Sequence, residues 1–516
     1  MRMIIDGRLA RLLAAGTGVL VAMTGIAAPA YAGAAPTPGA SGLGDRLYPK
    51  LGNGGYDVKN YDLRLRYPAK NPRQAITGDV TVTAVATQNL SRFDLDFAGK
   101  TVGAVSVNGR AATFSRSGEE LVIKPARYLA KGKRFTVKVI GFTATPTPAN
   151  ADAPDGWVAT ADGTVLAGQP NSSHKLFPSN DHPRDMATYT IRLTTPTGWT
   201  GVANGKHLSD TVTGSTVTSV YRESKPMASE LVQVVAGDFV VRNRARVNGV
   251  PIRDVVPRRL ANKLLPKAAI ERSQLAWMAK RVGPYPFENY GSLVIDADLG
   301  FALETQTLSL YDTGLFGQPA YILNPIMAHE LAHQWFGDSV APKSWSDVWQ
   351  NEGHATWYEL RYASDTKVFK KYTGYANETA FYKAMYQQGN LWRKKYGPVA
   401  RPARSTSVWD VFNPNVYGGG ALALYALQQK IGAKKFQKLE RAWVSKYRGK
   451  SASTADFIAL ASKISGRNLK PFLKSWLYGT KVPPMPGHKN WKPARSSSAA
   501  DVAQLDAFHN LAAARH

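Results

Sequence analysis

The chain has 516 residues, of which 44% are hydrophobic and 10% aromatic. This composition is that of a globular protein and excludes a disordered or fibrous chain, and the length exceeds what one hydrophobic core usually serves, so we expect at least two domains. Lys and Arg exceed Asp and Glu by 28, and Cys is absent, which excludes disulfides and thiolate chemistry.

Residues 1–32 have the features of a secretory signal peptide. Three Arg residues precede or open an apolar run that ends in Ala30-Tyr31-Ala32, the small-x-small form of a cleavage site. We expect cleavage after Ala32 and a secreted, extracellular protein with a net charge of +26 and no transmembrane anchor. An uncleaved anchor helix is the alternative.

The positive charge predicts the kind of partner outside the cell. It favours loose association with anionic cell-surface polymers or membrane surfaces. The basic residues are scattered, and the densest run is Arg393-Lys394-Lys395. Because they form no patch interleaved with aromatic residues, we expect no nucleic-acid binding.

The next part of the chain has the pattern of β-strands. Residues 33–45 are small and rich in Pro and Gly, which predicts a flexible linker. From residue 46 to 240 apolar residues alternate with polar ones, and Asn108-Gly109 predicts a tight hairpin turn. The alternation is clearest at Leu63, Leu65, Tyr67, Phe93, Leu95, Phe97, Phe135, Val137 and Val139. We therefore expect an all-β domain of sheets packed face to face.

One segment of this domain does not fit a strand. Residues 168–185 are polar and contain three prolines. Long loops on a rigid scaffold often reach a functional site. We expect this loop to do so.

Residues 241–484 have mainly helical periodicity. Residues 292–300 and the following FALETQTLSLY are expected to form two strands, and helices are expected over 416–432, 434–447 and 453–466. The last helix has Ser453 or Thr454 and Asp456 at its start. Residues 485–516 form a tail, either mobile or docked through a short helix that contains Val502, Leu505, Phe508 and Leu511.

The sequence HELAH at 329–333 predicts two metal ligands on one helix. Asn324 can cap that helix and Pro325 can open it, and it should end near Gly337. His329 and His333 are four residues apart, so both imidazoles project from one helical face and can bind one tetrahedral metal. Glu330 is placed to deprotonate a water at that metal.

The third ligand is expected from a second helix. Glu352 follows His333 by 19 residues, and Ser346-Asp347 predicts the start of the helix that carries it. Two His and one Glu leave one coordination position open, as in a catalytic zinc site, so we predict one Zn²⁺ per chain. We interpret His354 as an exposed or hydrogen-bonded side chain of this helix.

With HELAHQWFG, the spaced NEG and an upstream ALE followed by Thr-Gln-Thr, the chain resembles the zinc aminopeptidases of the aminopeptidase N family, peptidase family M1. LGNGGYDVKNYDLRLRY, GPYPFENYG and SWLYG extend the resemblance over residues 48–480. It implies a two-domain α+β fold: an N-terminal all-β saddle or sandwich over residues 46–240, then a thermolysin-like, mostly helical zinc domain of the gluzincin type over 241–484. The large helical C-terminal domain of many members is expected to be absent, which predicts a more open cleft.

The resemblance also implies roles for three further residues. Residues 301–305 match the family's motif Gly-x-Met-Glu-Asn, which implies that Glu304 would bind the free α-amino group of a substrate. This is physically sensible, because a carboxylate paired with an ammonium fixes the N-terminus of a peptide. The sequence departs from the motif at Phe301, Leu303 and Thr305. These departures affect the shape of the pocket for the first side chain of the substrate and the contact that the family's Asn makes with a carbonyl. Tyr417 would donate its hydroxyl to the oxyanion, Gln169 would lie near the amine, and Tyr425 is expected in the core.

These residues predict a secreted zinc metalloaminopeptidase that acts on peptides with a free N-terminus by metal-activated water attack, with Glu330 as the proton carrier. Two alternatives stay open. A zinc endopeptidase would also cleave a substrate with a blocked amine. A catalytically silent secreted binding protein on the same fold would hydrolyse neither.

Overall fold

The computed structural model describes residues 35–148, 156–404 and 410–494. The predicted signal peptide lies outside the described residues. From Pro36 onward the chain forms one compact unit. A search of the described residues finds no helix with the length and apolar character needed to span a membrane.

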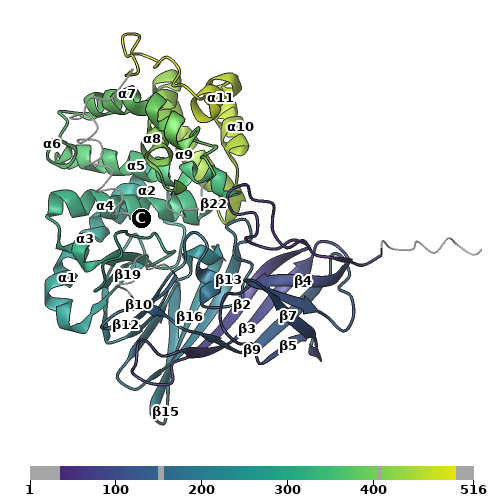
Figure 1. Ribbon diagram of the computed structural model, residues 1–516. Helices are drawn as coiled ribbons and strands as arrows, with labels where there is room; N and C mark the ends of the chain where they lie inside the picture. The colour runs from purple at the N-terminus through teal and green to yellow at the C-terminus, as the bar shows by residue number, and fades with distance from the viewer. Residues whose placement is uncertain (1–34, 149–155, 405–409, 495–516) are drawn as a thin grey trace, which may run out of the picture. The chain divides into compact units, whose positions relative to one another are not determined.

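The N-terminal half is built on an eight-stranded sheet in the order β15-β16-β13-β2-β3-β9-β5-β6, whose central strands run side by side in Figure 1. Alternate residues of its central strands are buried, because a strand turns successive side chains to opposite faces. Its strands are β2 (Tyr56–Arg66), β3 (Ile76–Ala86), β5 (Ala104–Val107), β6 (Arg110–Ala111), β9 (Arg134–Ala144), β13 (Ala187–Pro196), β15 (Lys206–Thr213) and β16 (Thr216–Met227).

Two smaller sheets complete the β half and share its hydrophobic core. The first has the order β1-β4-β8-β7, with β1 (Thr37–Pro38), β4 (Leu90–Asp96), β7 (Thr113–Ser117) and β8 (Glu120–Lys124). The second has the order β10-β11-β12-β17-β14, with β10 (Thr147–Pro148), β11 (Gly156–Ala159), β12 (Gly163–Ala167), β14 (Thr200–Ala203) and β17 (Val234–Gly237). The predicted β-rich N-terminal domain is confirmed.

The hairpin predicted at Asn108-Gly109 joins β5 to β6. Val107 pairs with Arg110, and Asn108 and Gly109 have φ angles of 51° and 74°. Two central residues with positive φ form the turn whose twist matches that of the strands it joins.

The prediction of a flexible linker over residues 33–45 is wrong for the part that the structure describes. Thr37 donates its backbone N–H to Asn89 at 2.9 Å, and Gly39 donates to Arg92 at 2.8 Å, so β1 lies parallel to β4. Asp45 is buried and accepts backbone N–H groups from Leu47 and Trp345. Composition gave no sign of these contacts, because they are made by the backbone and by one carboxylate.

The second half combines a small sheet with stacked helices. The sheet has the order β18-β19-β20-β21, with β18 (Phe239–Val247), β19 (Val250–Pro257), β20 (Ser292–Ile295) and β21 (Ser309–Asp312). The helices are α1 (Ala261–Ala268), α2 (Glu271–Val282), α3 (Thr313–Gly317), α4 (Ala320–His333), α5 (Trp349–Asp365), α6 (Phe369–Thr373), α7 (Glu378–Tyr396), α8 (Pro414–Ile431), α9 (Ala433–Tyr447), α10 (Thr454–Ser465) and α11 (Lys470–Tyr478). Figure 1 shows α7 to α11 stacked beyond α4 and α5.

Short elements join these parts. Strand β22 (Val340–Pro342) pairs in parallel with β23 (Lys450–Ala452). Single 3₁₀ turns lie at Ser173–Lys175, Ser229–Leu231, Arg258–Leu260 and Trp345–Asp347. The segment Gln334–Asp338 after α4 is kinked, since Phe336 (φ −119°, ψ 88°) and Gly337 (φ 134°, ψ −56°) are not helical. Since residues from Pro36 onward form one unit, the domain limit placed at residue 240 stays a prediction.

Both predicted helix starts around the metal motif need correction. Helix α4 begins at Ala320, so Pro325 lies inside the helix and does not open it. The apolar residues before Asn324 extend the helix upstream. Helix α5 begins at Trp349 and is preceded by the 3₁₀ turn at Trp345–Asp347.

Two further predictions are wrong. Of the strand expected over FALETQTLSLY only β21 forms, because residues 305–308 make a turn in which Leu308 donates to Thr305 and Thr307 has φ of 69°. The folded part does not end near Pro484, since Met485 and Trp491 are buried and Trp491 stacks on Tyr425. The helix proposed around Val502 to Leu511 lies outside the described residues.

The capping prediction for α10 is confirmed. Ser453 accepts the N–H of Asp456, and the Asp456 carboxylate accepts the N–H of Ser453. This reciprocal pair satisfies amides that the first helical turn leaves exposed.

The loop over residues 168–185 is held by a buried histidine. Nδ1 of His174 lies 2.6 Å from Oδ2 of Asp181, and Nε2 lies 3.6 Å from Glu119. Burial alone would lower the pKa of His174, but the contacts with Asp181 and Glu119 outweigh it and raise the pKa to about 10. The imidazolium therefore fixes this loop at neutral pH.

His174→Gln is expected to lower the free energy of unfolding most at about pH 6 and least at about pH 10. Because the pKa of His174 is higher in the folded state than in the unfolded state, its protonation stabilises the fold. This stabilisation is complete below about pH 6.5, the pKa in the unfolded state, and is lost as the pH rises through the pKa in the folded state. Urea unfolding at several pH values measures this difference. His207→Gln, at an exposed His–Asp pair on β15, is the control, and a pH-independent effect of His174→Gln would contradict the assignment.

Candidate active site

The two histidines of α4 and one glutamate of α5 converge on a single point. Nε2 of His329 and Nε2 of His333 each lie 3.4 Å from Oε2 of Glu352. The ligand atoms all lie within 4.8 Å of one another, and the three side chains are fully buried. Helix periodicity places the histidines one turn apart on α4, and the packing of α5 against α4 brings the carboxylate to them.

The other ring nitrogen of each histidine faces a hydrogen-bond acceptor. Nδ1 of His329 lies 2.8 Å from Oε2 of Glu359, and Nδ1 of His333 lies 3.1 Å from the carbonyl of Phe336. An Nδ1–H that donates in this way leaves Nε2 as the lone-pair atom. Tyr372 donates its hydroxyl to the second oxygen of Glu359, which orients that carboxylate.

This donor set fits one zinc ion. Two imidazole nitrogens and one carboxylate oxygen, with a coordination position left for water, are the ligands of catalytic zinc sites. The hydrogen bonds at Nδ1 select the ring form that binds a metal through Nε2. His329, His333 and Glu352 would hold the ion.

A second cluster of side chains, which contains two carboxylates, lies beside the metal ligands. One oxygen of Glu330, one of Glu304 and a ring nitrogen of His333 lie within 4.8 Å of one another. Nε2 of Gln169, on the loop over residues 168–185, donates to Oε1 of Glu304 at 2.8 Å. The side-chain amide of Gln334 donates to the Glu304 carbonyl at 3.0 Å, so the segment that follows α4 also fixes Glu304.

Acidic side chains gather around Glu304, and its contacts with the described residues include His333 but no Lys or Arg. Asp338 and Glu230 are buried close enough for the Glu304 charge to act on both. Burial raises the pKa of Asp338 and of Glu230 well above their ordinary values, and Glu304 shifts both in the same direction. A site of this potential favours a metal cation and a second cationic group such as an ammonium.

Tyr417 enters from α8. Its ring stacks against His329 with centroids 6.0 Å apart and an interplanar angle of 19°. Helices α5 and α8 approach closely at Gly353 and Gly420, where a Cβ on Gly420 would lie 2.9 Å from the Cα of Gly353. Two glycines therefore allow the helix backbones to touch and bring Tyr417 beside the metal ligands.

All seven residues that the sequence selected for the site lie around this point: His329, Glu330, His333, Glu352, Glu304, Gln169 and Tyr417. His354 is hydrogen-bonded, as expected, but fully buried. Tyr425 lies in the core and stacks on Tyr382.

Glu359 and Gln334 were missed by the sequence analysis. Glu359 lies seven residues after Glu352 on the same helical face, which was the available signal. Nothing in the sequence indicated that Gln334 would reach back to Glu304.

Comparison with known proteins identifies the same region. Residues 272–476 match the model of the Peptidase family M1 domain. Aminopeptidase M1-C of Oryza sativa subsp. japonica is 26% identical over 318 residues, which cover 59% of this chain and 35% of the relative. Glutamyl aminopeptidase of Mus musculus is 26% identical over 330 residues, 60% of this chain and 33% of the relative. The chain thus spans about a third of the length of these curated relatives.

Solved structures match over more of the chain. An M1 zinc metallopeptidase from Deinococcus radiodurans superposes with a TM-score of 0.75 and 28% identity, over 88% of this chain and 100% of that one. A mutant of that metallopeptidase bound to the substrate Tyr-Ser-Ala gives a TM-score of 0.73 and 29% identity, over 86% and 99%. The predicted α+β architecture is confirmed.

Glu359→Ala is expected to weaken zinc binding by about 10- to 100-fold, because the hydrogen bond at Nδ1 orients His329. Zinc affinity would be measured by competition with a chromophoric chelator. Asp365→Asn, on the same helix but paired with Arg281, is the control and should bind zinc normally. Unchanged affinity in Glu359→Ala would exclude the orienting role.

Proposed function

Because this chain carries a peptidase family M1 domain, we propose that it is a zinc aminopeptidase that releases N-terminal amino acids from peptides. The observation that supports this most directly is the position of Glu304. Its Oε1 lies 3.8 Å from Nδ1 of His333 and is held by Gln169. A fixed carboxylate beside the metal ligands would bind the ammonium of a free N-terminus and admit one residue before the scissile bond.

The protein's own residues supply the remaining steps. Zinc, when bound, would act as a Lewis acid and lower the pKa of a bound water. Glu330 accepts the proton of the attacking water on a carboxylate oxygen and passes it to the leaving amine nitrogen. The Tyr417 hydroxyl donates to the carbonyl oxygen as that oxygen becomes negative. The surrounding buried side chains exclude bulk water, which strengthens these interactions.

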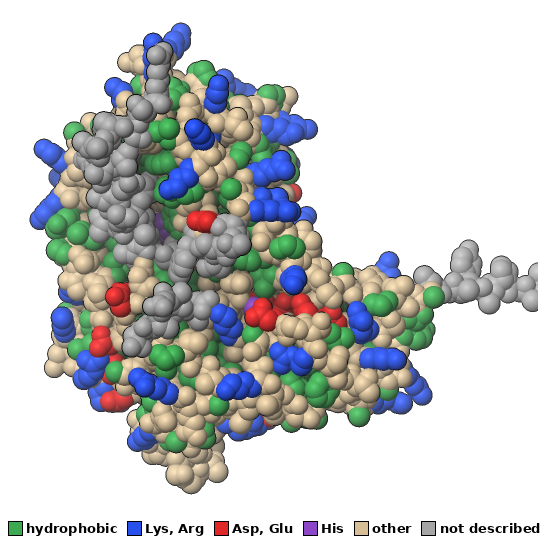
Figure 2. Space-filling model, viewed as in Figure 1, with side chains coloured by type: hydrophobic (Ala, Val, Ile, Leu, Met, Phe, Trp, Pro, Cys, Tyr) green, Lys and Arg blue, Asp and Glu red, His purple; other side chains and the backbone are tan. Residues whose placement is uncertain are grey.

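The proposal includes export and a surface partner. The sequence of residues 1–32 supports secretion, although it lies outside the described residues. Figure 2 shows Lys and Arg side chains spread over the viewed face, with acidic side chains gathered in fewer places. A dispersed positive charge supports loose, salt-sensitive association with anionic polymers at the cell surface.

Blocking the substrate amine is expected to abolish cleavage. The zinc-loaded chain should hydrolyse aminoacyl p-nitroanilides but not their N-acetyl forms, because acetylation removes the charge that Glu304 binds. Release of p-nitroaniline is measured, with chelator-treated protein as the control. Cleavage of the blocked substrate would favour the endopeptidase alternative, and hydrolysis of neither would favour a silent binding protein.

Glu330→Gln should retain zinc and lose nearly all turnover, because the amide cannot accept the proton. Tyr417→Phe should lower kcat by about 10²- to 10³-fold, the effect of removing one oxyanion donor. Tyr425→Phe, on the same helix with its hydroxyl 3.0 Å from His488, is the matched control and should leave kcat unchanged. Normal turnover in Glu330→Gln would refute the mechanism.

A further inference from the structure

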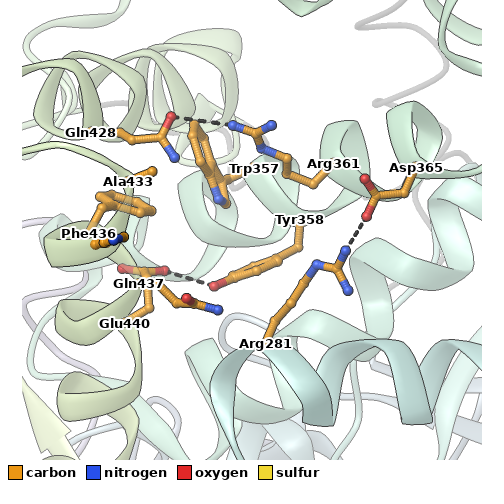
Figure 3. A pocket seen from close by; sticks show the side chains of 11 residues that line it. Arg281, Trp357, Tyr358, Arg361, Asp365, Gln428, Ala433, Phe436, Gln437 and Glu440 are labelled. Carbon is orange, nitrogen blue, oxygen red and sulfur yellow. Dashed lines mark hydrogen bonds and ion pairs between the residues drawn. The ribbon is translucent and has the colours of Figure 1, made fainter.

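A cavity of about 350 Å³ lies on the far side of α5 from the metal ligands. Glu352 and Glu359 are seven residues apart and share one face of α5, whereas Trp357, Tyr358 and Arg361 lie on other faces and line the cavity. Helices α2, α8 and α9 supply the remaining walls, as Figure 3 shows. The mechanism above uses none of the residues that line this cavity.

Basic side chains predominate in the lining. The basic residues in the lining are Arg281, Arg361 and Lys434, and the acidic residues are Asp365 and Glu440. Both acidic residues have partners: Asp365 is paired with Arg281, and Glu440 accepts the Tyr358 hydroxyl at 3.2 Å. These contacts are drawn in Figure 3.

Arg361 keeps donors for a ligand. Within the described part of the chain Arg361 forms an ion pair with Glu378 at 3.2 Å and donates to Gln428 at 3.3 Å. A guanidinium has five N–H donors, so these two partners do not use all of them. Lys434 is exposed in the first turn of α9. The sequence from Lys430 to Lys438 contains four Lys and no Asp or Glu, which adds positive potential beside the cavity.

The other walls are aromatic and apolar. Trp357 and Phe436 pack with ring centroids 5.1 Å apart, and Ala433 leaves room beside them. The guanidinium of Arg361 lies 4.9 Å from the centre of the Trp357 ring, which holds it in place over the wall. A cavity of this size with an apolar wall and a few fixed polar groups suits a small organic molecule.

We propose that this cavity is a second ligand site, separate from the metal site, that binds a small molecule carrying a carboxylate and an aromatic or aliphatic group. The carboxylate is bound by Arg361 and Lys434, since a guanidinium pairs with a carboxylate through parallel hydrogen bonds. The apolar group lies against Trp357, Phe436 and Ala433. The site depends on neither the metal nor the peptidase activity.

The test uses N-acetyl-L-phenylalanine, which has the carboxylate and the ring but no ammonium for Glu304. Calorimetric titration of the chain should give a Kd of about 1 mM or tighter. The affinity should be the same in zinc-loaded and metal-free protein. Arg361→Gln should weaken binding about tenfold, because a charge-assisted hydrogen bond is lost.

Two further variants distinguish binding in the cavity from a general effect of removing positive charge. Ala433→Trp fills the cavity from an exposed position and should abolish binding while circular dichroism stays native. Arg272→Gln, an exposed position on α2 that does not line the cavity, should bind like the unmodified chain. The proposal would be overturned if binding survived Ala433→Trp, if it required zinc, or if Arg272→Gln reduced it as much as Arg361→Gln does. It would also be overturned if no binding were detected.

Discussion

The burial of negative charge at one point between the two halves of the chain is the constraint on which the structure depends. Glu304, Glu330 and Glu352 are fully buried beside two imidazoles. Burying a carboxylate in its charged form is costly, and cations or hydrogen-bond donors placed beside it reduce that cost. The same arrangement therefore favours a metal ion and a second cationic group.

Each cationic group would be held from a different part of the chain. Helices α4 and α5 provide the metal ligands, and their hydrogen-bonded neighbours set the ring orientation of the histidines. The loop after β12 provides Gln169, which fixes the carboxylate that would bind an ammonium. The charged His174 pairs with Asp181 inside that loop and reaches Glu119, between β7 and β8, at 3.6 Å. The β half is thus part of the site.

Local patterns in the sequence predicted part of this arrangement. The i, i+4 histidines and the period-two strands obey short-range geometry that holds in any fold. Glu352 was found through its spacing in the motif, and the roles of Glu304, Gln169 and Tyr417 came from the resemblance to peptidase family M1. The predictions of helix starts were less accurate, because tertiary packing extends α4 upstream of Pro325 and replaces the first turn of α5 by a 3₁₀ turn. The spacing of Glu359 from Glu352 on one helical face was a usable signal, whereas the contact of Gln334 with Glu304 joins segments that only the folded chain brings together. The paired stretch near Thr37 was missed for the same reason.

The touching backbones at Gly353 and Gly420 have a consequence for how this protein tolerates change. Because main-chain atoms set the separation of α5 and α8 there, a side chain at either position would push the helices apart and shift Tyr417 away from His329. The absence of a side chain at these two positions is therefore what allows Tyr417 to lie against His329.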